Sequence, residues 1–280
     1  MSRMFACAAL IAAFTPALAS ADACKLSAQR DFDVDAAGLK TLKLELGASD
    51  AHIIGVAGLT KVEVRGRACA DDQAQLDRMQ VTQARTGDVL DVAAKLESSA
   101  INIGFGHSGT IGLKLDVRVP ASLALRVNAA AGDVDVRGVA SLEFDSVAGD
   151  LKVNDVAGAV VLSLAAGDVE GGNLGSLEVK RSAAGDIKLH DVKGDAHLAG
   201  VGAGDVSLSK VDGSVEIGNI GAGDVHVSQV ALDVHVTSLG IGDLEVEDVG
   251  GDLVVRSQGL GDINHRNVRG KVEVPGGNEE

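Results

Sequence analysis

The sequence predicts an all-β fold: a parallel β-solenoid of about eight coils, preceded by a β-rich N-terminal segment. A Gly-Asp pair recurs eight times between Gly132 and Val274, at intervals of 17 to 19 residues. Aliphatic residues recur at fixed positions within each interval. A repeat this short cannot bury an apolar face alone, so successive copies must stack. The pairs begin at Gly132, Gly149, Gly167, Gly185, Gly204, Gly223, Gly242 and Gly261.

The N-terminus, residues 1–19, has the pattern of a secretory signal peptide. Arg3 precedes a short apolar run, and residues 17–19 form an A-x-A cleavage site, with a second candidate site that ends at Ala23. The apolar run is too short to span a bilayer. We therefore expect an exported protein that is not an integral membrane protein, in the periplasm first and otherwise at the cell surface or secreted.

Cysteine usage predicts one disulfide. Cleavage of the signal peptide would remove Cys7 and leave Cys24 and Cys69. An even pair of cysteines in an oxidising compartment most simply forms a bond. This bond would close a loop of about 45 residues and stabilise the fold by about 3–4 kcal/mol.

Residues 24–128 form the β-rich segment, in which no repeat is visible. Residues 71–79 predict the only helix, opened by two carboxylates that suit a helix N-terminus. Residues 98–110 predict an exposed Gly/Ser-rich loop with an apolar tip that could contact a partner. Residues 104–109 spell G-x-G-x-x-G, but no helix follows to bind a phosphate. Alternating apolar and polar residues predict strands at 32–34, 41–45, 52–56, 61–65, 80–83, 89–95, 112–119 and 122–127.

Each Gly-Asp copy is expected to form two short strands, and together the copies form a solenoid over residues 129–275. In the fifth copy, aliphatic residues stand at Val206, Leu208 and Val211, and the same i, i+2, i+5 pattern starts again at Val215. The step of two keeps side chains on one face of a strand, and the step of three indicates a bend. Glycine turns the corners because a positive φ costs it little.

Two copies depart from this pattern. Gly171 stands where an aliphatic residue belongs, which predicts a narrower or bulged coil. The last copy places His265 at an inward position and is followed by a polar tail at residues 276–280. A polar final coil is what the exposed end of a sheet requires.

These features together resemble a known family. An exported N-terminus and a β-rich segment that ends in Val-Arg-Val-Pro (residues 117–120) precede G-D-[VIL]-x-[VL] repeats. The chain is similar in this respect, from Leu39 to Val274, to the bacterial putative-adhesin family of exported β-solenoid proteins, a domain of unknown function. The resemblance implies a cell-envelope solenoid without established catalytic residues.

The aspartates of the Gly-Asp pairs align along one edge of the predicted solenoid and allow two interpretations. Calcium-binding β-rolls have a similar repeat length, but calcium needs six to eight oxygen ligands, and one Asp per corner supplies few. The favoured interpretation is that each carboxylate accepts a hydrogen bond from the backbone of its own turn. The row consists of Asp133, Asp150, Asp168, Asp186, Asp205, Asp224, Asp243 and Asp262.

A second candidate is a metal site on one outer face. His197, Glu216 and His235 occupy the same position in three successive copies. Two imidazoles beside a carboxylate could bind zinc or copper. A solvated row of surface side chains is the favoured interpretation, and we expect no cofactor.

Composition narrows the functional class. The net charge of −15 disfavours nucleic acid and anionic lipid, whose phosphates bind Lys and Arg. The chain has no Trp or Tyr to stack on sugar rings, and the repeats contain no long insertions that could build a cleft. We therefore predict no catalytic residues and a non-enzymatic, adhesin-like structural or interaction protein of the envelope, whose partner is an unidentified envelope protein or glycan. The alternatives are a self-associating scaffold that stacks end to end and a polysaccharide-acting β-helix enzyme.

Overall fold

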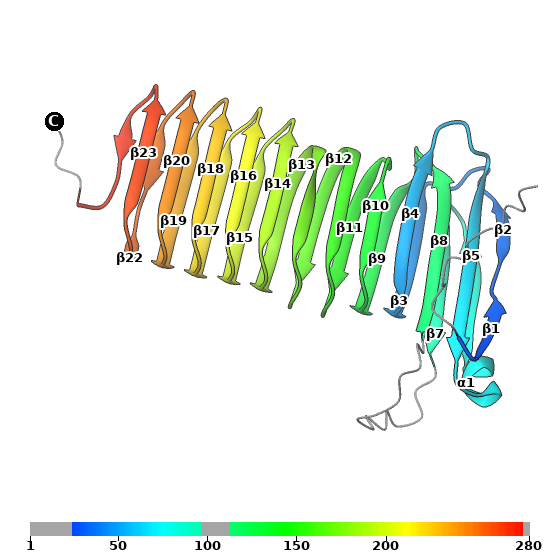
Figure 1. Cartoon of the computed structure of the whole chain (residues 1–280). Coiled ribbons are helices and arrows are strands. Elements are labelled where there is room, and N and C mark those ends of the chain that lie inside the picture. The colour runs from blue at the N-terminus through cyan, green and yellow to red at the C-terminus, as the bar shows by residue number, and fades with distance from the viewer. Residues whose placement is uncertain (1–23, 97–111, 277–280) are drawn as a thin grey trace, which may run out of the picture.

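The protein is a long β-solenoid with a β-rich cap at its N-terminal end (Figure 1). The computed structural model describes residues 24–96 and 112–276. The predicted signal peptide, the 98–110 loop and the end of the polar tail lie outside the described residues. Within the described ranges, no helix is both long and apolar enough to cross a membrane.

The helix and strands fall into an N-terminal region and a repeat region. The first comprises β1 (Leu26–Gln29), β2 (Phe32–Asp35), β3 (Thr41–Ala48), β4 (Asp50–Val56), β5 (Lys61–Ala70), α1 (Gln73–Arg78), β6 (Met79–Thr86), β7 (Val89–Leu96), β8 (Gly112–Pro120) and β9 (Ala124–Ala131). The second comprises β10 (Val134–Arg137), β11 (Ser141–Ser146), β12 (Leu151–Leu164), β13 (Val169–Ala184), β14 (Ile187–Val192), β15 (Ala196–Ala203), β16 (Val206–Val211), β17 (Val215–Ala222), β18 (Val225–Val230), β19 (Val234–Ile241), β20 (Leu244–Val249), β21 (Leu253–Val255), β22 (Gln258–Leu260), β23 (Ile263–Val268) and β24 (Val272–Glu273).

Each coil contributes one strand to each of two faces, and the coils stack in parallel register. Val206 pairs with Ile187 of the preceding coil and with Val225 of the following coil. On the other face, β17 pairs in the same way with β15 and β19. The predicted inward residues are buried in rows, so the parallel β-solenoid expected from the sequence is confirmed.

The bend inside each coil is made by a residue in the left-handed conformation. Lys210 is the example in the fifth copy, with a φ of 54°. Such a residue is strained unless its neighbours compensate. A hydrogen bond between two such residues of adjacent coils offsets part of this strain: Asn173 Nδ2 donates to Asp155 Oδ1 at 2.7 Å. The residues at this position with φ between 54° and 58° are Asp155, Asn173, Asp191, Lys210, Gln229, Asp248 and Asn267.

The glycine of each Gly-Asp pair is required by space as well as by conformation. Gly204 has a φ of 130°, and a Cβ there would lie 2.1 Å from the carbonyl oxygen of Gly185. The corners of successive coils therefore approach each other more closely than any side chain allows.

Parallel stacking already starts before residue 129, where the sequence pattern placed the start of the solenoid. Strand β3 pairs with β7 and β9, and β4 pairs with β8 and β10, all in parallel. The coil formed by residues 41–56 thus lies between two coils that follow it in the sequence. Figure 1 shows blue β4 next to green β8 and β10.

The N-terminal end of the solenoid is covered by antiparallel strands. Strand β5 pairs with β8, β1 and β2, and β6 pairs with β7. The expected helix is present as α1, capped by Asp72, whose Oδ1 accepts from the N–H of Gln75 at 2.8 Å. Cys24 and Cys69 form the expected disulfide, which ties the start of the described chain to β5.

The copy that contains Gly171 and the last copy, which contains His265, both depart from the regular coil structure. The β12–β13 pair contains register shifts, so an irregular coil is present as predicted. Gly171 itself stays in register with Val153 and Leu189, and the shifts lie in the second half of the two strands. At the C-terminal end, His265 pairs with Val246 at the inward position and is exposed.

Candidate functional site

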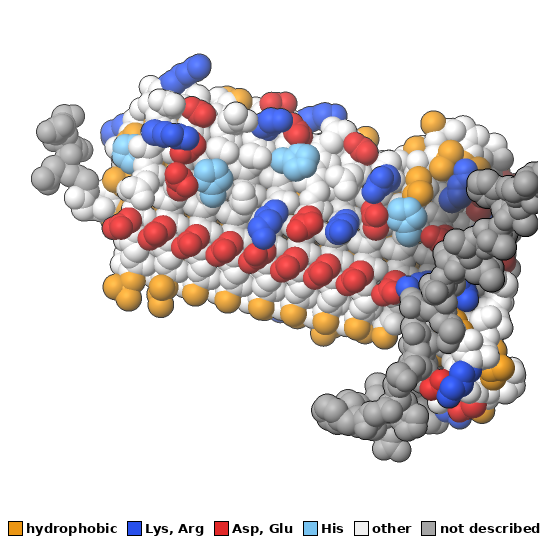
Figure 2. All heavy atoms as spheres, in the orientation of Figure 1, with side chains coloured by type: hydrophobic (Ala, Val, Ile, Leu, Met, Phe, Trp, Pro, Cys, Tyr) orange, Lys and Arg blue, Asp and Glu red, His pale blue; other side chains and the backbone are white. Residues whose placement is uncertain are grey.

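A continuous row of aspartates runs along one edge of the rod (Figure 2). The Oδ1 atom of Asp205 accepts a hydrogen bond from the backbone N–H of Asp224 in the next coil, at 2.9 Å. The same bond recurs between every neighbouring pair, with N–O distances from 2.8 to 3.2 Å. The row begins at Asp50 of the inserted coil, which has no Gly-Asp pair. The acceptors in order are Asp50, Asp133, Asp150, Asp168, Asp186, Asp205, Asp224 and Asp243.

The expectation that each aspartate bonds its own turn is therefore wrong. The carboxylate bonds the adjacent coil because the tight glycine corner brings the next backbone N–H within reach. At Asp186 this bond from Asp205 is the largest cause of a lowered carboxyl pKa, followed by the contact of Lys188 Nζ with Oδ2 at 3.0 Å. The row thus joins coils to one another, and one oxygen of each carboxylate is already occupied.

A second row of the same kind was not predicted from the sequence. Asp195 accepts from the N–H of Ser214 at 2.9 Å, and Asp233 accepts from the N–H of Asp252 at 2.7 Å. Asp252 in turn accepts from Lys271. The signal was Asp just before the second strand of three coils, at positions 195, 233 and 252, with Ser214 in the intervening coil.

The candidate metal ligands lie on neighbouring strands. His197 pairs with Glu216, and Glu216 pairs with His235, on β15, β17 and β19. His197 Nδ1 lies 3.2 Å from Glu216 Oε2, which makes an ion pair when the imidazole is protonated. In residues 24–96 and 112–276, no three His, Cys, Asp or Glu side chains are placed to hold a metal ion. Zinc or copper binding at these three residues stays a prediction.

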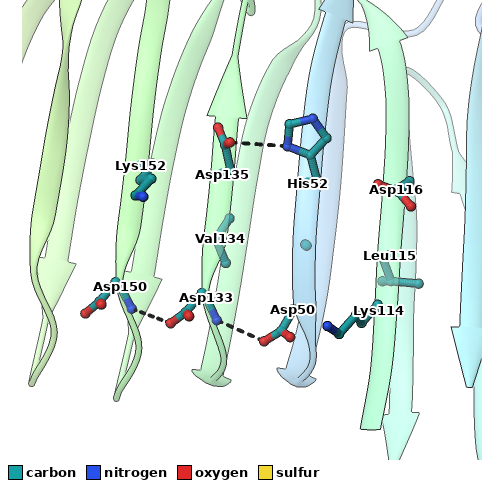
Figure 3. A pocket seen from close by; sticks show the side chains of 11 residues that line it. Asp50, His52, Lys114, Leu115, Asp116, Asp133, Val134, Asp135, Asp150 and Lys152 are labelled. Carbon is teal, nitrogen blue, oxygen red and sulfur yellow. Dashed lines mark hydrogen bonds and ion pairs between the residues drawn. The ribbon is translucent and has the colours of Figure 1, made fainter. Parts of the chain in front are cut away.

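A hollow of about 340 Å³ lies where the inserted coil meets its neighbours (Figure 3). His52 Nδ1 lies 3.3 Å from Asp135 Oδ2 across the β4–β10 boundary. Strands β4, β8, β10 and β12 each contribute to it, so it could not be predicted from local sequence patterns. Its charged lining residues are Asp50, His52, Lys114, Asp116, Asp133, Asp135, Asp150 and Lys152.

The comparison with protein families decides the classification. The family model described as Toastrack DUF4097 matches residues 59–275 of the chain. The chain belongs to the Toastrack DUF4097 family. This confirms the resemblance to a β-solenoid family of unknown function. None of the curated proteins matches this Toastrack chain.

Several solved structures are similar to this Toastrack protein at low sequence identity. A "putative cell adhesion protein" from Clostridium sporogenes is 10% identical, with 89% of this chain and 100% of that chain covered and a TM-score of 0.39. A "putative adhesin" from Bacteroides fragilis is 14% identical, with 89% and 97% covered and a TM-score of 0.32. A "putative lipid binding protein" from Parabacteroides distasonis is 13% identical, with the same coverage and a TM-score of 0.36. These likenesses are too remote to carry a functional argument.

The chemistry that the Toastrack hollow offers is that of a charged, open surface. Carboxylates, two lysines and one imidazole can bind a polar ligand through hydrogen bonds and ion pairs. The His52–Asp135 pair resembles a base with its orienting group, but no Ser or Cys lines the hollow to act as its nucleophile. The hollow can therefore bind a polar or charged ligand.

Proposed function

We propose that this Toastrack protein is a non-enzymatic, adhesin-like structural or interaction protein of the cell envelope. The observation that carries this proposal is the register of the outward side chains. Residues 19 positions apart, such as His226 and Glu245, lie side by side on adjacent strands, and their side chains are 3.2 Å apart. Rows of this kind form a rigid, repetitive surface, which suits contact with an extended partner.

The partner we propose is an envelope protein or glycan that donates hydrogen bonds and carries positive charge. The chain has a net charge of −15, and the Asp row gives one edge a fixed line of carboxylates. Complementary charge would steer such a partner to the rod. The predicted signal peptide supports a periplasmic location, with the cell surface or secretion as alternatives.

Capture of envelope components on the immobilised mature chain tests this proposal. Two matched variants locate the contact: Asp116→Asn removes a carboxylate that lines the hollow, and Glu216→Gln removes one on the opposite face. We expect specific, salt-sensitive capture that Asp116→Asn weakens and Glu216→Gln leaves unchanged. Equal capture by both variants would remove the hollow from the proposal, and no capture from any envelope fraction would refute the proposal itself.

The polysaccharide enzyme remains the alternative to test in parallel. Hydrolysis or lysis of an envelope glycan would need a general acid and base that converge on one bond. We expect no new reducing ends or unsaturated products when the chain is incubated with purified envelope glycans. Product that accumulates with time and with protein concentration would replace the interaction proposal by an enzymatic one.

A further inference from the structure

The two ends of the solenoid differ in how they are covered. At the N-terminal end, β5 and β6 run antiparallel to the coil strands β8 and β7 and occupy their edges, and β1 and β2 pair in turn with the far edge of β5. At the C-terminal end, β23 pairs with β20 and β24 pairs with β21, and no other described strand pairs with either. The first coil is therefore followed by strands that run antiparallel to it, whereas the last described coil presents a parallel edge on which no described strand lies.

Backbone hydrogen bonds show which groups the open end exposes. The N–H of Val225 donates to the carbonyl oxygen of Asp243 in the next coil at 2.8 Å. The N–H of Leu244 donates in the same way to Asp262 at 2.9 Å. Ile263 is the next residue in this register, so its N–H points out of the end of the rod. An incoming strand would find this donor already oriented.

The side chains at this end continue the apolar core. Ile263, Val268, Val272 and Val274 are only partly buried and pack against the last covered coil. Nearby, Leu260 is 70% exposed and Ile241 is 57% exposed. His265 is the one polar residue among the inward positions of β23. Although the outward residues of this coil are polar, the surface that another coil would cover is mostly aliphatic.

We propose that the open end binds the open end of a second copy, so that two rods join tail to tail. An antiparallel β23–β23 pair centred on Asn264 would place Ile263 of each copy opposite His265 of the other. The same register brings Asp262 of one copy opposite Arg266 of the other, so unlike charges meet. The end of the rod thus offers a second copy both backbone and charge complementarity.

This arrangement differs from the end-to-end scaffold considered from the sequence, which stays a prediction. A filament needs a head-to-tail contact, and the antiparallel cap occupies the head. A tail-to-tail contact uses the same surface twice and closes after two copies. Because the end is only one coil in cross-section, it buries less than a standard interface, and the dimer is a weak one. The inference stands independently of the envelope partner, since it uses a different surface.

Sedimentation velocity of the mature chain from micromolar to millimolar concentration tests the proposal. We expect a monomer–dimer equilibrium that stops at two copies. Ile263→Pro removes the open N–H, which has no acceptor within the described chain, and should weaken dimerisation by about tenfold or more; the melting temperature of the variant checks that the last coil still packs on the core. Val147→Lys, at a residue 62% exposed on the side of the rod, is the matched control and should leave dimerisation unchanged.

Disulfide trapping gives a readout that does not depend on the proline variant. On the twofold axis, the two Asn264 residues form a non-hydrogen-bonded pair with Cα atoms about 4.5 Å apart, within disulfide range. Asn264→Cys should therefore yield a cross-linked dimer under mild oxidation. Ser207→Cys, on the same outward row in the middle of the rod, should not. A monomer at every concentration, growth beyond two copies, or equal cross-linking of both variants would overturn the proposal.

Discussion

The Oδ1 atom of Asp205 accepts the backbone N–H of Asp224 at 2.9 Å, although the two residues are 19 positions apart. This bond joins one coil to the next, and its repetition along the rod makes the Gly-Asp pair a connector between coils. The glycine permits the close approach of two corners, and the aspartate bonds across it. The two residues of the pair therefore have one shared structural role.

Removal of this connector should destabilise the rod at the position of the change. Asp205→Ala leaves the N–H of Asp224 without its acceptor, and we expect a loss of about 0.5–1.5 kcal/mol in the free energy of unfolding. Asp205→Asn keeps the acceptor oxygen and should lose less. Chemical denaturation measures both. If the two variants are equally destabilised, charge rather than the hydrogen bond accounts for the row.

The glycine should be far less tolerant than the aspartate. Gly204→Ala places a Cβ 2.1 Å from the carbonyl oxygen of Gly185 at a φ of 130°, so we expect a loss of more than about 3 kcal/mol. Gly58→Ala is the control, because its φ is also positive, at 75°, but no atom lies within 4 Å of the added Cβ. A cost of about 1 kcal/mol is expected there. Similar melting temperatures for the two variants would contradict the close corner packing.

The lowered pKa of Asp186 predicts a dependence of stability on pH. The folded-state carboxyl pKa lies below its ordinary value of 3.8, chiefly because of the hydrogen bond from Asp205 and then because of Lys188. The ionised form is therefore favoured in the folded state, and its stabilisation is present above this ordinary value. It is lost as the pH falls through the lower folded-state pKa. Below about pH 4, the melting temperature of the wild type should fall more steeply than that of Asp186→Asn; parallel curves would be evidence against this contribution.

Metal ions should not stabilise the chain. Calcium needs six to eight oxygens, and the Asp row already uses one carboxylate oxygen per coil for a backbone N–H. Thermal melts with EDTA and with excess calcium are expected to coincide. A separate zinc titration compares the wild type with His235→Ala. A zinc-dependent rise in melting temperature that this variant abolishes would establish the site at His197, Glu216 and His235.

The disulfide should contribute measurably to the stability of the cap. Cys24 and Cys69 are 45 residues apart in the sequence, and a loop of this length corresponds to about 3–4 kcal/mol. The free energy of unfolding of the double variant Cys24→Ser, Cys69→Ser should be lower by about 3–4 kcal/mol. Chemical denaturation measures this difference. Alkylation and mass spectrometry of the exported protein should detect no free thiol, and two reactive thiols would contradict the bond.

The repeats could be predicted from the sequence because their signal is local and periodic. Val206, Leu208 and Val211 recur in register, so the coils, their faces and their core follow from spacing alone. The coil of residues 41–56 could not be placed in this way. It carries Ser49-Asp50 in place of Gly-Asp, and its neighbours in the solenoid come from later parts of the chain.

The candidate sites were harder to predict than the fold. Sequence spacing aligned the aspartates, but it did not show which backbone N–H each carboxylate would bond. Only the close approach of Gly204 to Gly185 explains why the adjacent coil supplies the donor. The hollow at His52 and Asp135 was missed because it forms only when the inserted coil lies between its neighbours.

We propose that this Toastrack rod acts by contact and not by turnover. Isothermal titration calorimetry of the mature chain with a captured envelope component tests it most directly, because binding and catalysis produce different heat signals. We expect heats that saturate at a fixed stoichiometry and then stop. A steady heat flow that continues after saturation and scales with the protein concentration would show turnover and contradict the claim.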